Sequence, residues 1–141
     1  MQDKYIKKID FVFFNEKNIR QAVIEEREDA IKPELKNGSG LSDPTARDAI
    51  RNLTPLPFIK LAGEILKFPE SWLNVIDKTY NWCKRQSACH YETVRRKYLG
   101  IHYRKICFDL HISITTFHNL INRARQYAAL QAVQLNLIFI D

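Results

Sequence analysis

Apolar positions in the first thirty residues recur at alternating intervals of four and three. The seam that they form also holds two glutamates, and its members are Tyr5, Ile9, Val12, Glu16, Ile19, Val23, Glu26 and Ala30. No Gly or Pro interrupts residues 3–32, so the pattern predicts one long helix that ends at Pro33. Such a seam suits two arrangements equally well. The helix packs on its own domain, or it pairs with a second copy as a coiled-coil homodimer.

The pattern loses its regularity after Pro33. The stretch Asn-Gly-Ser-Gly indicates a loop, and Ser42 followed by Pro44 predicts a new short helix. Residues 57–68 fit either a β-hairpin or a helical turn. Two prolines just upstream and Gly63 at the centre favour the hairpin.

Helical periodicity returns at Pro69 and continues almost to the end of the chain. Four helices are predicted, starting at Pro69, Ser87, His102 and Ser113, and the last three end near Leu99, Leu110 and Asn136. The apolar face of the first is Trp72, Val75, Ile76, Thr79, Tyr80 and Cys83, and Val94 and Tyr98 point inward from the second. The apolar side of the fourth is Phe117, Leu120, Ile121, Ala124, Ala128 and Leu130. Gly100 is placed to end the second helix in a left-handed conformation.

The predicted fold is therefore mostly all-α, with a short β-hairpin near 57–68. Three parts follow from the pattern: a helical arm at 1–36, a linker at 37–68 that holds the short helix and the hairpin, and a helical domain at 69–141.

Charge separates the two halves of the chain. Residues 1–70 hold 12 Lys/Arg and 12 Asp/Glu, whereas residues 71–141 hold 10 and 4, so the whole net charge of +6 comes from the second half. A one-sided basic segment on helices favours a polyanionic partner, with nucleic acid as the first candidate.

The segment ICFDLHISITTFHNLINRAR at 106–125 has the residue spacing of a helix-turn-helix. Cys107 is the small residue that a steep helix crossing requires, and Ser113 is placed to cap the second helix. The apolar contacts are Ile106, Leu110, Ile112, Phe117 and Leu120. His111 stands where such turns usually have Gly, because the position needs a positive φ, which His tolerates better than β-branched residues do.

The outward positions of the second helix are polar, and no acidic residue occurs between Asp109 and Asp141. Short polar side chains on a helix can reach base edges in the major groove of DNA. The candidate base-reading residues are Ser113, Thr115, His118, Asn119 and Asn122. The candidate phosphate contacts are Arg95, Arg96, Lys97, Arg104, Lys105, Thr116 and Arg123.

Residues 91–125, from YETVRRKYLG to INRAR, resemble the DNA-binding region four of bacterial sigma factors. Together with SDPTARDAI and FPESWLNVIDKTY, they resemble the phage and prophage late-gene regulators of the ArpU and RinA type over roughly residues 42–130. The resemblance implies a virus- or prophage-encoded transcription factor that binds double-stranded DNA, with bacterial RNA polymerase as a further partner. His111 in place of Gly departs from the usual pattern.

Other classes of function find little support in the sequence. No catalytic constellation is recognisable, and the adjacent Cys89 and His90 diverge by about 100° on a helix, so we expect no enzyme and no cofactor. The spacing of Cys83, Cys89 and Cys107 matches no zinc site and favours buried thiols. No apolar run is long enough to span a membrane, and the start lacks signal-peptide features, so we expect a cytoplasmic protein of the bacterial host cell.

The sequence thus predicts a DNA-binding transcriptional regulator of phage or prophage genes. The alternative is a phage DNA-packaging protein similar to a small terminase subunit, which also joins a DNA-binding helical domain to an oligomerising helix.

Overall fold

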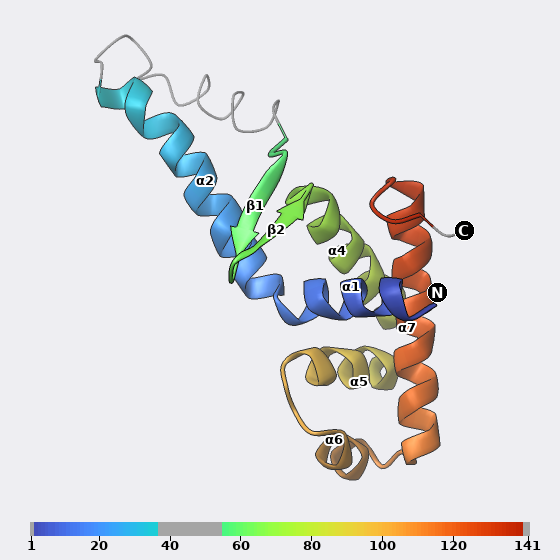
Figure 1. The fold of residues 1–141 in the computed structure, drawn as a ribbon. Coiled ribbons are helices and arrows are strands. Elements are labelled where there is room, and N and C mark those ends of the chain that lie inside the picture. The colour runs from blue at the N-terminus through green and yellow to red at the C-terminus, as the bar shows by residue number, and fades with distance from the viewer. Residues whose placement is uncertain (1, 37–54, 140–141) are drawn as a thin grey trace. The chain divides into compact units, whose positions relative to one another are not determined.

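The computed structural model describes residues 2–36 and 55–139. Within these ranges the chain forms six helices and one two-stranded antiparallel sheet (Figure 1). This confirms the predicted mostly helical fold with a short hairpin. The helix predicted from Ser42 lies outside the described residues. None of the described helices combines the length and the apolar character that crossing a membrane requires.

The chain forms two compact units. One unit combines Met1–Glu16 with Ser71–Asp141, and the other is Lys17–Glu70. These boundaries differ from the predicted division at 36 and 68. The difference arises because the first helix, α1 (Gln2–Phe14), packs on the C-terminal helices α5 (Ala88–Tyr98) and α7 (Ile114–Gln134). Figure 1 shows α1 and α5 side by side, both reaching α7.

The prediction of one helix over residues 3–32 is wrong, because the structure has a break at Asn15. Helix α1 ends at Phe14 and α2 spans Glu16–Lys36. The Asn15 side chain donates its amide N–H to the carbonyl of Phe11 at 2.8 Å, beside the Asn15 backbone N–H at 3.1 Å. Asn competes in this way with the regular helical ladder. Helix α2 also continues through Pro33, so the proline does not end it.

The apolar seam of α1 is covered within its own unit. Ile9 and Val12 are buried, and the ring of Phe13 lies 5.7 Å from that of Tyr80 and 5.0 Å from that of Tyr98. For this part of the seam, the structure favours packing on the chain's own domain over pairing with a second copy.

Residues 58–67 form the predicted hairpin. Strand β1 (Phe58–Leu61) pairs with β2 (Glu64–Lys67), and Ile59 faces Leu66 across the pair, both of them buried. The connecting residues Ala62 and Gly63 have φ values of 47° and 83°. Two successive positive φ angles match the right-handed twist of a two-residue hairpin.

The four predicted C-terminal helices are all present. They are α4 (Pro69–Gln86), α5, α6 (Tyr103–Leu110) and α7. The six residues predicted for the face of α4 are all buried. Gly100 follows α5 at φ 90°, and the N–H of Ile101 donates to the carbonyl of Arg96 at 3.1 Å, as in a glycine-terminated helix. Leu130 was predicted to face inward on α7 but is 60% exposed, because the buried line there runs through Ala128, Ala129 and Ala132.

A buried histidine joins α5 to α7. The Nε2–H of His90 donates to the carbonyl of Leu120 at 3.0 Å. The Trp82 ring meets His90 edge-on at 5.2 Å and stacks on Tyr127 at 4.8 Å. Burial lowers the pKa of His90, and the hydrogen bond to Leu120 opposes that change. This contact fixes α5 against the middle of α7.

Candidate nucleic-acid interface

The turn between α6 and α7 has the geometry that the sequence predicted. His111 adopts φ 55° and ψ 46°, in the left-handed region. The N–H of Ile112 donates to the carbonyl of Cys107 at 3.0 Å, which closes the end of α6. The Ser113 hydroxyl oxygen accepts the N–H of Thr116 at 3.0 Å and caps α7. A left-handed residue followed by a capping serine reverses the chain within three residues.

The apolar residues that were predicted to hold the two helices together lie next to this turn. Ile106, Cys107 and Phe117 are buried, whereas Leu110, Ile112 and Leu120 are partly buried. The Cys107 thiol lies 3.8 Å from the carbonyl oxygen of Ser113, at the point where the two helices approach. A larger side chain at this position would separate the helices, so Cys107 acts as the small residue that the spacing predicted.

The outer face of α7 presents an uncharged polar row. We name Thr115, His118, Asn119 and Asn122 the reading row, and all four are exposed. Ser113 is the fifth predicted base-reading residue, and its hydroxyl is engaged in the cap. The hydroxyl accepts the N–H of Thr116 and donates to Thr116 Oγ1 at 3.0 Å. The cap therefore occupies both Ser113 and Thr116, and neither belongs to the reading row.

An aromatic group that the sequence reasoning did not include lies beside the reading row. The Tyr103 ring stacks on His102 at 4.6 Å and lies 6.2 Å from the ring of His118. The guanidinium of Arg104 is 5.8 Å from the centre of the same tyrosine ring. The available signal was the run His-Tyr-Arg-Lys at the start of α6, where two ring side chains are followed by two basic residues at a helix N-terminus.

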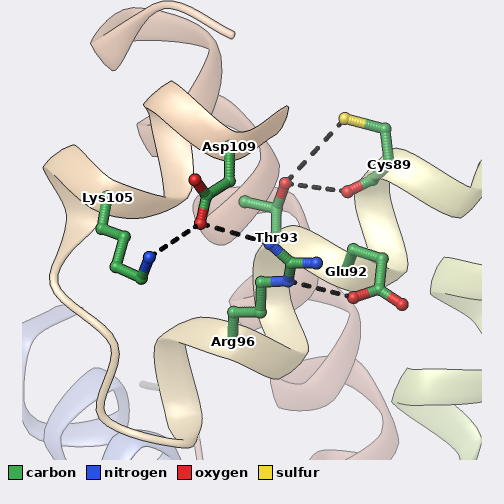
Figure 2. Close-up of polar contacts among 6 residues, drawn as sticks. All are labelled: Cys89, Glu92, Thr93, Arg96, Lys105 and Asp109. Atoms are coloured by element: carbon green, nitrogen blue, oxygen red, sulfur yellow. Dashed lines mark hydrogen bonds and ion pairs between the residues drawn. The ribbon is translucent and has the colours of Figure 1, made fainter. Parts of the chain in front are cut away.

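The predicted phosphate contacts differ in how accessible they are. Figure 2 shows the carboxylate of Asp109 between two of them, with the Lys105 amine at 3.3 Å and Arg96 Nη1 at 3.8 Å. Arg96 also donates to Glu92 at 3.1 Å. This cluster joins α5 to α6 and pairs two cations with two carboxylates. Its net charge is therefore zero.

Two more of the predicted phosphate contacts, Arg95 and Lys97, are engaged by other residues of the same unit. Arg95 donates to Glu16 at 3.0 Å, and its guanidinium lies 5.3 Å from the centre of the Tyr80 ring. Lys97 is half-buried, and its pKa is lowered by burial and then by the nearby positive charge of Arg125. Both cations are engaged inside the protein.

Arg104 and Arg123 remain as exposed cations. Within the described residues, neither makes an ion pair with a carboxylate. Arg104 lies in the first turn of α6, and Arg123 follows Asn122 on α7. The site thus consists of an uncharged reading row with an exposed arginine on each of the two helices of the turn.

Comparison with known proteins gives no relative: no family model, no curated protein and no solved structure matches the chain.

Proposed function

We propose that this protein is a sequence-specific DNA-binding transcriptional regulator in which α7 enters the major groove. The observation that carries the proposal is the exposed reading row on the first turns of α7, set behind a left-handed turn residue and a serine cap. A helix face selected only for contact with water would normally carry both signs of charge. The absence of any acidic residue from Leu110 to Ile140 supports a position next to phosphate.

Recognition would be divided between two kinds of contact. Asn119 can donate to and accept from adenine through its amide, whereas Arg104 and Arg123 would contact phosphates on either side of the groove. Lys105 is exposed and can turn from Asp109 to a phosphate at a small cost, because exposed ion pairs contribute little. Arg95, Arg96 and Lys97, which are engaged within the protein, would make no direct contact with the DNA.

The biological setting is proposed from the resemblance to phage and prophage late-gene regulators, and from the likeness of the helix-turn-helix to sigma region four. The proposed location is the cytoplasm of a bacterial host. There it would bind promoter DNA and act on bacterial RNA polymerase. The exposed ring of Phe108, on α6 next to the turn, leaves an apolar side chain available for such a protein partner.

The test is recovery of bound fragments from phage and host genomic DNA, followed by affinity measurements on the recovered site and on random duplex. Asn119→Ala should cost about 1–3 kcal/mol on the recovered site and leave binding to random DNA unchanged. The matched control is Asn74→Ala, which makes the same change at an exposed asparagine of α4 and should alter neither affinity.

Three results would count against the proposal. Failure of the wild-type protein to retain any DNA at low salt would refute DNA binding. Equal loss on both DNAs with Asn119→Ala would remove α7 as the reading element. Recovery of a packaging site in place of promoter regions would favour the terminase-like alternative over transcriptional regulation.

A further inference from the structure

A bidentate ion pair connects the N-terminal helix to α7. Asp10 of α1 accepts Arg125 Nη2 on Oδ2 at 2.8 Å and Arg125 Nε on Oδ1 at 3.0 Å. The Tyr98 hydroxyl donates to the same Oδ1 at 2.6 Å. The side chains of Asp10 and Arg125 are only 23% and 21% exposed. Two parallel charge-assisted bonds in a partly buried setting hold the guanidinium in one orientation.

Arg125 belongs by position to the side of α7 that carries the reading row. His118, Asn122 and Arg125 are separated by four and three residues, so they follow one another along a single helix face. An arginine one turn beyond the reading row is placed to reach the phosphates at the edge of the groove. Its guanidinium instead turns back to α1, with Nη1 3.4 Å from the amide oxygen of Asn122.

The charge of the same carboxylate also acts on the half-buried amine of Lys97. The positive charge of Arg125 disfavours the protonated form of Lys97, whereas Asp10 favours it. Asp10 is therefore the ion-pair partner of Arg125 and also favours the protonated form of Lys97. Removing its charge would leave Arg125 without its partner, next to the proposed DNA-binding face.

We propose that Asp10 limits sequence-independent affinity for DNA, because it keeps Arg125 from making a contact with the DNA backbone. The proposal rests on the DNA-binding function proposed above. Specificity is a difference between two affinities, and a phosphate contact strengthens binding to every sequence alike. Withholding one arginine therefore lowers the affinity for random DNA and for the preferred site alike, and selection is left to the reading row.

The test compares wild type with Asp10→Asn in titrations of random duplex and of the preferred site over a range of salt concentrations. Asn keeps the shape of Asp10 and an acceptor for Tyr98 but loses the charge. One added phosphate contact should steepen the log–log salt dependence on random DNA by about 0.9. Affinity for the two DNAs should rise by a similar factor, so the ratio between them should stay near the wild-type value. The double variant Asp10→Asn/Arg125→Gln should return the slope to the wild-type value.

The control for net charge is Glu64→Gln, which removes one negative charge from an exposed position of β2 and should leave the slope unchanged. The proposal is overturned if a folded Asp10→Asn variant keeps the wild-type slope. It is equally overturned if the increase survives in the double variant, or if Glu64→Gln produces the same increase.

A second variant keeps the proposal testable if Asp10→Asn does not fold. Arg125→Gln alone should not change the slope, because Arg125 makes no phosphate contact in the wild type, whereas a decrease of about 0.9 would overturn the proposal. A wild-type protein that binds no DNA would refute the proposed function itself. A wild-type protein that binds selectively would refute only the role of Asp10 if Asp10→Asn leaves the slope on random DNA unchanged or if Arg125→Gln lowers it.

Discussion

Replacing His111 with glycine should stabilise the protein. The residue sits at φ 55°, and an L-residue in the left-handed region costs about 1–2 kcal/mol relative to the right-handed one. Glycine removes this cost but loses more chain entropy on folding, about 0.5–1 kcal/mol relative to alanine. The His111 side chain is exposed, so little contact is lost. The net gain should be about 0.5–1 kcal/mol.

Thermal unfolding followed by circular dichroism measures this gain. For a unit of this size, it corresponds to a rise in Tm of roughly 2–8 °C. His111→Val is the matched comparison, because a β-branched residue is disfavoured at positive φ and should lower Tm. The reasoning is refuted if His111→Gly lowers Tm, or if the valine variant is as stable as the glycine variant. Either result would mean that the turn does not require the left-handed conformation.

Two further predictions concern charge. Arg104→Ala should weaken binding to specific and random DNA alike and reduce the salt slope by about 0.9, whereas the control Arg85→Ala on α4 should do neither. Both variants are compared with wild type in DNA titrations over a salt series. A loss of affinity confined to the specific site would mean that Arg104 contacts a base. Burial lowers the pKa of His90, so the unfolded chain binds the proton more readily and stability should decline as pH falls below about 6.5. Between pH 7.5 and 5.5, the denaturant midpoint of unfolding should fall less for His90→Gln than for wild type. An equal fall in both proteins would show that His90 is not the group that causes the pH dependence.

The features that the sequence predicted correctly are those set by neighbours along the chain. The face of α4 follows from residues three and four apart, and the hairpin follows from Gly63 between two short apolar runs. The positive φ of His111 and the cap at Ser113 also depend on local spacing. Local patterns predict such elements because the same few hydrogen bonds form wherever the pattern occurs.

Features that depend on contacts between distant residues could not be predicted in this way. The break at Asn15 is a local feature that the pattern also misses, because an asparagine does not interrupt every helix that contains it. The packing of α1 on α5 and α7 needs tertiary information, and so does the pairing of Asp10 with Arg125, which are 115 positions apart. A count of charges along the chain treats these two residues as belonging to separate segments, one neutral and one basic.

The pairing of Asp10 with Arg125 shows that the charges of the two halves of the chain are not separate in the folded protein. The neutral first half contributes Asp10 and Glu16 to the basic second half, where they engage Arg125 and Arg95. Asp109 and Glu92 engage two more cations within the second half. The surface around the reading row is therefore less basic than the sequence suggests. A protein with few free cations binds random DNA weakly, so selection among sites would depend mainly on the uncharged side chains of α7.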